Sequence, residues 1–564
     1  MKTPCIQIHL VIVAASLWTV NPTMADWPIC TESSDQYHCG IVESESGGAI
    51  ISWWDVSDGQ SYAQRIDSSG VRQWAPAGVH IDLAQEGYRH KIAPDMTGGA
   101  IAAHVSATGP LYEKGIFVQR INVNGTNLWG SGGVLANTWL TYMGDVELCV
   151  TSDGEGGAIL AWDETPLGLP YYVKVARISS VGQLLWSSTI YTGVDYGAHG
   201  LELVSDGQGG VFLTWTTTND PQGGCSVRAQ RVNAAGQSAW AVNGAILSSS
   251  STYKEDPHLV ADGIGGCIVA WLEVTEPQDN NIYAQRLFYT GDIAWSDGGV
   301  PISEAMTIQG EPFLVPDESG GAIITWSEYD SDAGGYGESD IYAQRITQTG
   351  TVLWTSDGIL VSGAPGSQTM NLYSSMHPVV PDGESGAIIV WYDNRNEDLD
   401  LYAQRISASG YPQWQFDGSP VCTAEGTASW PSCIAASDGR ALVSWSDPRY
   451  GDYDIYAIRI PMDPTSVEPP LPRLPDLFQN YPNPFNPLTI IEYAVPTPGH
   501  VRLAIYDVHG RLVRKLADQR MDAGYHQVTW DGTNDQGRSI ASGMYFYRAE
   551  IGEETKTRKM LLIR

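Results

Sequence analysis

Cysteine is scarce in this chain. There are eight cysteines among 564 residues; Cys5 lies in an N-terminal segment that we expect to be removed, and the other seven include no CxxC pair. That lack argues against a zinc site, and an odd number of cysteines is no disulfide framework. Cys30 and Cys422 occupy matching places in an internal repeat, as do Cys39 and Cys433. This pattern fits either two local disulfides, Cys30–Cys39 and Cys422–Cys433, or buried free thiols.

Positive charge is also sparse. The chain has 31 Lys and Arg against 64 Asp and Glu, a formal net charge of −33 at pH 7. From residue 477 onward the signs nearly balance, eleven against nine, so the acidic excess lies upstream. An acidic body repels nucleic acid and anionic lipid, so neither is expected as a partner.

An apolar run long enough to cross a bilayer is missing. The run at residues 10–20 is shorter than the roughly 18–20 residues that a spanning helix needs. It follows Lys2 and precedes the small-residue site Thr23-Met24-Ala25, so we interpret residues 1–25 as a signal peptide. A retained anchor is the alternative. We expect an exported, soluble mature chain with no transmembrane segment.

The body of the chain shows no helical periodicity and instead repeats one pattern about every 55 residues. Apolar residues follow a Gly-Gly pair, a Trp closes that run, and a segment like Ile-Tyr-Ala-Gln-Arg-Ile comes next. This last segment occurs at residues 62–66, 117–121, 174–178, 228–232, 283–287, 342–346, 402–406 and 456–460.

Each copy reads as four short strands. In the seventh, apolar runs at 377–380 and 386–391 flank the turn Asp382-Gly383, and further strands are expected at 401–406 and from 412. Four strands per repeat of this length are typical of a β-propeller blade. We therefore predict an all-β propeller over residues 26–461. The copies number eight, or seven blades if the divergent copy with His104 is incomplete.

Tryptophan recurs at two places in the repeat. A first set closes the second strand and has His104 in place of Trp in copy two; the second set lies at the fourth strand. The first set is Trp53, Trp162, Trp215, Trp271, Trp326, Trp391 and Trp445, and the second is Trp74, Trp129, Trp186, Trp240, Trp295, Trp354 and Trp414. We expect these rings to pack blade against blade rather than to stack on sugars.

The two ends of the array complement each other. The eighth copy stops at Pro461 without a fourth strand, while residues 27–31 match residues 419–423, where the seventh copy has its fourth strand. We predict that the N-terminal strand completes the last blade and closes the ring, which removes exposed sheet edges. An open solenoid is the alternative.

The C-terminal region has a different composition. A Pro-rich linker, residues 462–476, precedes short alternating strands at 477–564, which predict a small β-sandwich. Residues 478–487, Ile505-Tyr506-Asp507, Trp530-Asp531-Gly532, 542–547 and 559–562 carry a resemblance to a known module. They resemble the C-terminal sorting domain of bacterial type IX secretion and the Ig-like domain of flagellar hook-capping proteins.

The resemblance implies an Ig-like fold, the secretion machinery as partner, and a place outside the cell or on the outer-membrane surface of a bacterium. It also implies that the tail is removed or joined to surface polysaccharide. An accessory Ig-like domain without a sorting role is the alternative. The upstream repeat resembles uncharacterised propeller repeats of similar secreted bacterial proteins, which implies no activity.

No catalytic motif stands out: HExxH, a P-loop and a GxGxxG opening a helix are all missing. Loops such as residues 153–157, Asp-Gly-x-Gly-Gly, suggest calcium, but a tight hairpin explains them better, so no cofactor or metal is predicted. An acidic residue recurs two places after most members of the first Trp set. An Arg recurs on the third strand of every copy. We predict that these charges pair within each blade rather than bind cations. The acids are Asp55, Glu164, Glu273, Glu328, Asp393 and Asp447, and the arginines Arg65, Arg120, Arg177, Arg231, Arg286, Arg345, Arg405 and Arg459.

Function in a repeat protein is expected where the copies differ, at one mouth of the central channel. Variable polar residues occur at the start of the innermost strand and after the second strand. The candidate ligand-binding residues are His90, Glu147, Glu202, His258, Glu311, His377, Arg395 and Arg449. The first hypothesis is a surface propeller that binds an extracellular glycan or protein. The alternatives are a polysaccharide hydrolase or lyase, which would draw its acid and base from this set and Asp256, and a structural surface-layer component.

Overall fold

The computed structural model describes residues 26–563 except 82, 84–89, 108–112, 141–145, 165–169, 194–197, 219–224, 251, 277–278, 330–337, 371–376, 397, 437, 462–475, 478–479, 481–482 and 553. The expected signal peptide and nearly all of the expected linker lie outside these residues. Apart from one 3₁₀ turn, η1 (Glu45–Gly47), the described elements are strands.

Eight antiparallel sheets follow one another along the chain, and in the first seven the strands pair in sequence order. One parallel pairing joins the fifth and sixth sheets into a continuous nine-stranded sheet. The first sheet is β2 (Gln36–Glu43), β3 (Ala49–Asp55), β4 (Gln60–Ile66) and β5 (Val79–His80), and the second is β6 (Lys91–Pro94), β7 (Ala100–Ala107), β8 (Glu113–Ile121) and β9 (Val134–Leu140). The third is β10 (Leu148–Ser152), β11 (Ala158–Glu164), β12 (Tyr171–Ile178) and β13 (Leu184–Gly193), and the fourth is β14 (Ala198–Ser205), β15 (Val211–Thr217), β16 (Cys225–Val232) and β17 (Ala245–Ser250). The fifth is β18 (Tyr253–Ala261), β19 (Cys267–Glu276), β20 (Asp279–Leu287) and β21 (Val300–Ser303).

The last three sheets vary this plan. In the sixth and seventh the first strand is divided into two short pieces, and in the eighth the fourth strand comes from the N-terminus. The sixth is β22 (Ile308–Gln309), β23 (Phe313–Pro316), β24 (Ala322–Tyr329), β25 (Ser339–Ile346) and β26 (Ile359–Ser362). The seventh is β27 (Gln368–Thr369), β28 (Val379–Pro381), β29 (Ala387–Asn396), β30 (Asp398–Ile406) and β31 (Ser419–Cys422), and the eighth is β32 (Ser429–Ala435), β33 (Ala441–Asp447), β34 (Asp454–Ile460) and β1 (Trp27–Cys30).

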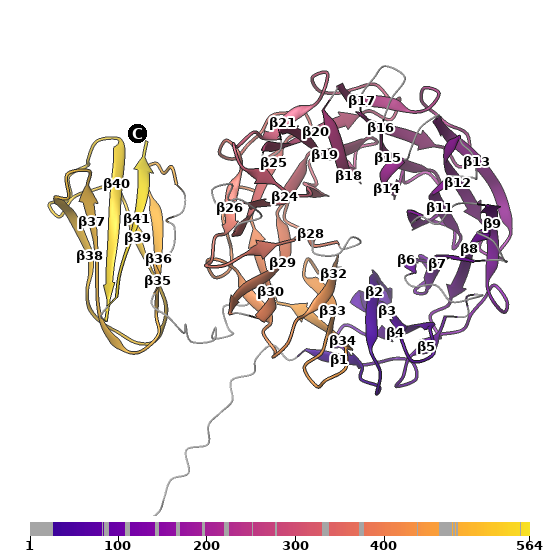
Figure 1. Cartoon of the computed structure of the whole chain (residues 1–564), viewed down its shortest axis with the longest axis horizontal. Helices are drawn as coiled ribbons and strands as arrows, with labels where there is room; N and C mark the ends of the chain where they lie inside the picture. Colours follow the sequence, from indigo (N-terminus) through magenta and orange to yellow (C-terminus); the bar gives the residue numbers. More distant parts are fainter. Residues whose placement is uncertain are drawn as a thin grey trace, which may run out of the picture.

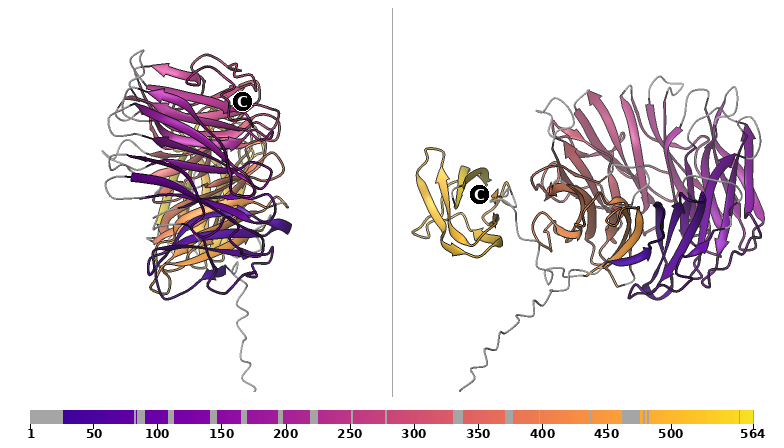
Figure 2. Two further views of the ribbon diagram at one scale, coloured as in Figure 1. Left: turned by 90° about the vertical axis from the view of Figure 1, so that its right-hand side faces the viewer. Right: turned by 60° about the horizontal axis from the view of Figure 1, so that its bottom comes forward.

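The sheets are the blades of a β-propeller. Figure 1 shows them around a central axis, with the first strands innermost and the fourth strands at the rim, and Figure 2 shows the ring edge-on. The divergent copy with His104 forms a full four-stranded sheet, so the direct count of eight blades is confirmed. Because each sheet is covered on both faces by its neighbours, a middle strand such as β11 is buried at every position. This is why apolar residues occur in unbroken runs.

The N-terminal strand completes the eighth blade. Trp27 of β1 pairs with Ala457 of β34, as the match between residues 27–31 and 419–423 predicts. Ile29 of β1 belongs to an apolar cluster that joins the eighth blade to Ile51 and Trp53 of the first. Arg449 also forms an ion pair with Asp26, just before β1. The two ends of the repeat array therefore share one hydrophobic core.

Both Trp sets pack between blades, as predicted. Every Trp of the first set is at most 1% exposed. In the second set, Trp129 donates its indole N–H to the carbonyl of Ser180 in the next blade, 3.1 Å away, and lies over Gly182. The same bond joins Trp74, Trp186, Trp240, Trp295 and Trp354 to the carbonyls of Val123, Ala234, Tyr289, Gln348 and Ala408.

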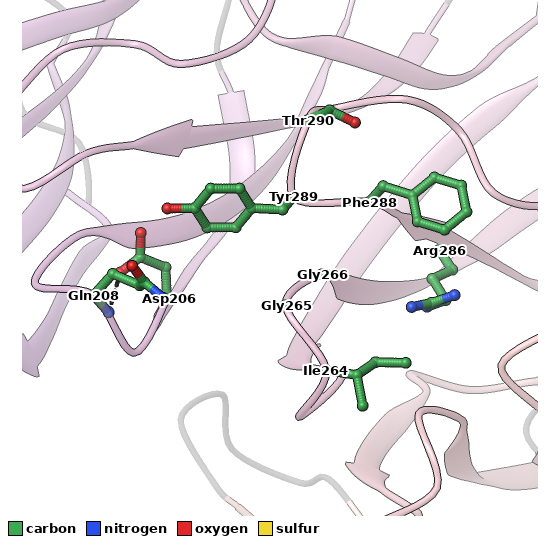
Figure 3. A pocket seen from close by; sticks show the side chains of 9 residues that line it. All are labelled: Asp206, Gln208, Ile264, Gly265, Gly266, Arg286, Phe288, Tyr289 and Thr290. Carbon is green, nitrogen blue, oxygen red and sulfur yellow. Dashed lines mark hydrogen bonds between the residues drawn. The ribbon is translucent and has the colours of Figure 1, made fainter.

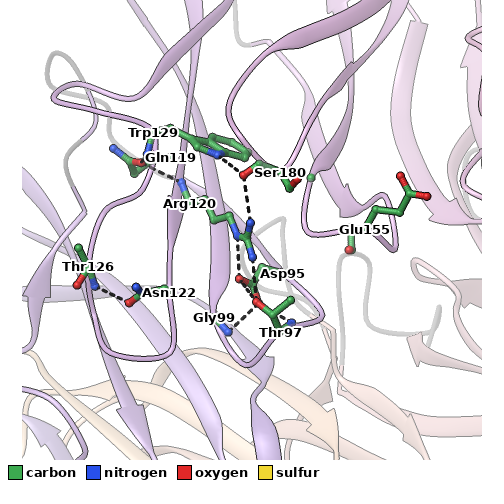
Figure 4. A network of polar contacts seen from close by, with 12 residues as sticks. Asp95, Thr97, Gly99, Gln119, Arg120, Asn122, Thr126, Trp129, Glu155 and Ser180 are labelled. Carbon is green, nitrogen blue, oxygen red and sulfur yellow. Dashed lines mark hydrogen bonds and ion pairs between the residues drawn. The ribbon is translucent and has the colours of Figure 1, made fainter.

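The repeated Arg pairs with an acid other than the one we predicted. In the second blade, Asp95 accepts the N–H groups of Thr97 and Gly99 through one carboxylate oxygen, and the other oxygen lies 2.9 Å from Nε of Arg120 (Figure 4). Arg120 also donates to the carbonyl of Ser180 in the third blade. The same ion pair recurs as Arg177–Asp153, Arg231–Asp206, Arg286–Asp262, Arg345–Asp317 and Arg405–Asp382. The Asp-Gly-x-Gly-Gly loop is thus a capped hairpin whose carboxylate already has protein partners.

The predicted partner acid has another role. The carboxylate two residues after a first-set Trp accepts the indole N–H of that Trp in four blades, at 3.0 Å for Trp391 and Asp393. The other three pairs are Trp162–Glu164, Trp326–Glu328 and Trp445–Asp447. These acids are therefore part of the blade packing.

The two proposed disulfides are wrong. Cys30, Cys422 and Cys433 are free and buried; the side chain of Cys39 lies outside the described residues. In each proposed pair, one cysteine lies in the fourth strand of a blade and the other in the first strand of the next blade, as with Cys422 in β31 and Cys433 in β32. The width of a blade therefore separates them, beyond the reach of a disulfide.

The C-terminal region is a β-sandwich. One sheet holds β35 (Asp476–Leu477), β36 (Thr489–Val495) and β39 (Gly524–Trp530), and the other holds β37 (Gly499–Asp507), β38 (Leu512–Met521), β40 (Gly543–Ile551) and β41 (Glu554–Leu562). Alternate residues of β40 are buried, and Trp530, Tyr545 and Tyr547 share one core cluster. The alternation in the sequence predicts this architecture correctly.

Candidate functional site

Three neighbouring first strands bring an ion-paired row to the propeller axis. His258 of β18 lies between two carboxylates: its Nδ1 is 2.7 Å from Oε1 of Glu202 in β14, and its Nε2 is 2.6 Å from Oε1 of Glu311, just before β23. The three side chains are 15–24% exposed, so the row is partly open to solvent. One side chain from each of the fourth, fifth and sixth blades is thereby linked.

Strand register explains why these residues meet. Glu202 pairs with Thr214 and His258 with Ala270, in both cases the residue directly before a first-set Trp. Equal register in adjacent blades places the two side chains beside each other. A β-bulge precedes each residue, and Asp256 in the second bulge has φ 49°, a conformation uncommon outside glycine. Bulges of this kind re-aim side chains beside functional sites.

The row holds separated charges. Burial would lower the pKa of His258, but the charges and hydrogen bonds of Glu202 and Glu311 outweigh it and raise this pKa well above its ordinary value. Burial would likewise raise the pKa of Glu202, but His258 brings it below its ordinary value. At neutral pH His258 is therefore a cation between two anions.

Two further titratable groups lie close by. Burial, followed by the charge of Glu311, raises the pKa of Asp256 to about 7. Loss of solvent around His377 lowers its pKa, an effect that the charge of Glu202 partly offsets. Near pH 7, Asp256 is consequently able to give or accept a proton, while His377 is neutral. We call Glu202, Asp256, His258, Glu311 and His377 the axial cluster.

Glu147 lies at the edge of this cluster and has a structural task. Its carboxylate accepts the backbone N–H groups of Gly200 and Leu201 in the next blade. Its own N–H donates to Asp163, whose pKa is raised to about 7 by burial and then by Glu147. The sequence pattern did not identify Asp163, because only the fold places this residue beside Glu147.

The fold thus brings together at the axis five of the eight predicted site residues: Glu147, Glu202, His258, Glu311 and His377. Lys91 acts electrostatically on His377 and belongs to the same surroundings, although we did not select it. Its register could have identified it, because Lys91 pairs with Ala103, directly before His104. Arg395, Arg449 and His90 lie apart from the cluster.

Arg395 and Arg449 pack within the blades, apart from the axial cluster. Arg395 pairs with Asp393 and lies 4.0 Å over the ring of Tyr402. Arg449 pairs with Asp447 in the same way and lies 3.9 Å over Tyr456. Both guanidinium groups therefore have partners within the blades, and Arg449 also donates to the thiol of Cys422 in the seventh blade.

His90 is also buried rather than exposed at the mouth. It is 1% exposed, and neither ring nitrogen has a hydrogen-bond partner among the described residues. Burial, then the neighbouring His104 and His38, lowers the pKa of His90 to about 3. It is a neutral core histidine.

This burial predicts a pH-dependent effect of His90→Leu. The unfolded chain binds a proton at His90 below about pH 6.5 while the folded chain does not, so this residue costs the fold stability as the pH falls. The variant's advantage in free energy of unfolding should grow by up to about 1.4 kcal/mol per pH unit below pH 6.5. Urea unfolding at pH 7, 6 and 5 measures it, with the exposed His500→Leu as control. An advantage that does not change with pH would contradict the assignment.

Neither a metal centre nor a membrane helix is found in the part of the chain described. No group of three or more His, Cys, Asp or Glu there is arranged to hold a metal ion. Nor does any helix there have the length and apolar character needed to span a membrane.

Solved structures with similar folds include three of interest. The polysaccharide lyase Uly1 is 9% identical over 75% of this chain and 90% of its own, with a TM-score of 0.38. The endo-arabinase from Bacteroides thetaiotaomicron is 11% identical over 54% of this chain and 90% of its own, with a TM-score of 0.27. PorZ, a surface component of the type IX secretion system of Porphyromonas gingivalis, is 12% identical over 93% of this chain and 81% of its own, with a TM-score of 0.20.

The sequence comparisons concern the C-terminal sandwich. A search of curated proteins gives no match. Residues 490–553 match the FlgD Ig-like domain family, a segment that contains β37 and β40 and most of the core between the two sheets. The C-terminal module is therefore an FlgD-type Ig-like domain.

Proposed function

We propose that this protein is exported to the bacterial cell surface or the medium and binds a glycan without acidic groups at the axial cluster. The observation that carries the proposal is the row Glu202–His258–Glu311, drawn from three blades and partly exposed beside Asp256 and His377. Carboxylates accept hydrogen bonds from sugar hydroxyls, and a neutral imidazole both donates and accepts. The His258 ion pairs hold Glu202 and Glu311 in place before a ligand arrives.

Charge favours a neutral ligand. The axial cluster and its neighbour Glu147 contain four carboxyl groups, against the cations His258 and Lys91, and the chain carries −33 overall. Such a field repels uronates and sulfated sugars. A neutral polysaccharide can approach this negative field without electrostatic repulsion.

Hydrolysis or lysis of a polysaccharide is the second candidate. The charge of Glu311 helps to raise the pKa of Asp256 to about 7, and Glu202, in the same row, has its pKa lowered by His258. A protonated acid beside an ionised carboxylate is the arrangement that glycoside hydrolysis uses. In this case Asp256 would protonate the leaving oxygen.

We propose a sorting role for the FlgD-type Ig-like domain. Its support is the position of the domain at the C-terminus, after the propeller, and the ordered motifs from Phe478 to Leu562 that resemble type IX sorting domains. The secretion machinery would then be its partner. The propeller would be the cargo.

A glycan-array and hydrolysis screen on the mature chain, residues 26–564, tests the axial site. We compare the wild type with Asp256→Asn/His377→Ala, since Asn tolerates the positive φ of Asp256 and Ala removes only the imidazole of His377. Asp452→Asn/His500→Ala changes the same residue types at exposed places and is the control. The wild type should bind neutral glycans, and the axial variant should bind them at least about tenfold more weakly, about 1.4 kcal/mol.

The outcomes separate the candidates. Unchanged binding by the axial variant, a preference for acidic glycans, or no glycan binding would overturn the proposal. Product release by the wild type that Asp256→Asn abolishes would establish the enzyme instead.

A further inference from the structure

The fifth blade departs from the repeat in the turn between its third and fourth strands. In six other described turns the first residue accepts backbone N–H groups through a side-chain oxygen, as Asn233 does from Ala235 and Gln237 at 3.0 Å. The other five are Asp67, Asn122, Ser179, Thr347 and Ser407. The fifth blade has Phe288 there, which gives up a hydrogen bond of about 1 kcal/mol.

The departure exposes apolar side chains at one place. Phe288 and the next residue, Tyr289, are 44% and 38% exposed. In the first hairpin of the same blade, Ile264 is 57% exposed where five other blades have Thr97, Glu155, Gln208, Ser319 and Glu384. Neither hairpin packing nor turn geometry requires these three residues, since other blades build the same hairpin and turn from different residues.

These residues line a pocket between the fourth and fifth blades, the fifth-blade pocket. It has a volume of about 580 Å³, within the range of small-ligand sites, and Asp206, Gln208 and Arg286 supply polar walls. Figure 3 shows Tyr289 directed toward Asp206 and Gln208, with Phe288 on the other side near Arg286. At Gly265, between them, a Cβ would meet open space.

The walls are held in place without a ligand. The Arg231 guanidinium lies 3.6 Å from the centre of the Tyr289 ring and hydrogen-bonds its hydroxyl. Arg286 is tied to Asp262 and to the carbonyl of Gln348 in the sixth blade. The pocket is therefore preorganised, which lowers the entropy lost on binding.

We propose that the fifth-blade pocket is a second saccharide-binding site. A pyranose ring has an apolar C–H face, which suits an exposed aromatic ring, and a rim of hydroxyls, which suits the amide of Gln208 and the hydroxyl of Thr290. A purely apolar ligand would bury those polar groups without partners, at a cost. The pocket lies at hairpins and turns beyond the end of β18, whereas His258 lies within that strand, and the pocket lining shares no residue with the axial cluster. The inference is therefore independent of the axial site.

The repeat itself supplies a variant that should fold. Ile264→Gln/Phe288→Asn/Tyr289→Ala gives the fifth blade the residues that the fourth has at Gln208, Asn233 and Ala234. Because the same turns are already built from those residues one blade away, we expect an unchanged or slightly raised Tm. Val181→Ala, which trims a 72% exposed side chain in the corresponding turn of the third blade, is the control.

The measurement is ligand-observed NMR and calorimetry with cellohexaose, laminarihexaose and mannohexaose on the full mature chain. The wild type and Val181→Ala should bind at least one of these, and the triple variant should bind it at least about tenfold more weakly. Each site is also tested with the other one removed. The triple substitution should cause the same loss in the Asp256→Asn/His377→Ala background, and the axial substitutions are tested in the triple variant, which separates the pocket from the axial site. No hexaose binding, equal binding by the triple variant, or selective capture of a proline-rich peptide in place of the sugars would overturn the proposal.

Discussion

A chain that begins at residue 33 instead of 26 is expected to lose most of the stability of its propeller. The deletion removes β1, so that β34 loses its pairing partner and the eighth blade presents an open edge. It also removes Ile29 and Cys30, which are at most 2% exposed, from the core between the eighth and first blades. Trp27, which packs on Gly70 of the first blade, is lost as well.

The expected loss is at least about 5 kcal/mol, because one buried Ile is worth about 2–5 kcal/mol and a packed Trp about 3–5. Differential scanning calorimetry of the mature and shortened chains measures it, and Ile29→Ala should show part of the same loss. Val242→Ala, at a side chain 90% exposed, should leave the propeller transition unchanged. A shortened chain with the Tm of the mature protein would show that the ring does not depend on its N-terminal strand.

Removal of residues 477–564 is expected to stop export beyond the periplasm. The truncated chain retains the expected signal peptide and every strand of the propeller but lacks the FlgD-type Ig-like domain. If that domain carries the sorting signal, the truncated chain crosses the inner membrane but not the outer membrane. The surface-exposed and released fractions should fall from most of the protein to background, with a folded propeller in the periplasm.

Cell fractionation and surface proteolysis measure this distribution in the native host. Trp530→Ala, which empties the centre of the sandwich core, should reproduce the defect because a buried Trp contributes about 3–5 kcal/mol to so small a domain. Val508→Ala, at an exposed turn of the same domain, is the matched control. Surface display of the truncated chain at the wild-type level would show that the domain is an accessory module without a sorting role.

Much of the fold could be predicted because the repeat encodes local rules eight times. A Trp after an apolar run, a Gly-rich hairpin and an Arg on the third strand each recur with the same spacing, so chance similarity is excluded. The missing fourth strand of the last copy and the extra one at the N-terminus made their pairing predictable. Alternation in β40 revealed the sandwich in the same way.

The candidate site was less predictable. Glu202, His258 and Glu311 could be selected as departures from the repeat, yet only register and the β-bulges show that His258 bridges the other two. Arg395 has the same sequence signal, a charged residue after the second strand, but its ring and carboxylate partners lie in its own blade. Sequence variation identifies positions free to change, not the direction in which a side chain points.

Sequence alone determined the strand order, the repeat count, the packing role of tryptophan and the sandwich at the end, because these follow from the spacing of apolar and turn residues along the chain. Tertiary structure alone decided which charges pair, that the six cysteines with described side chains stay free, and that the fifth-blade turns line a pocket. Ion pairs, thiol separations and pockets depend on distances through space, which the ring geometry sets and the local spacing of residues does not contain.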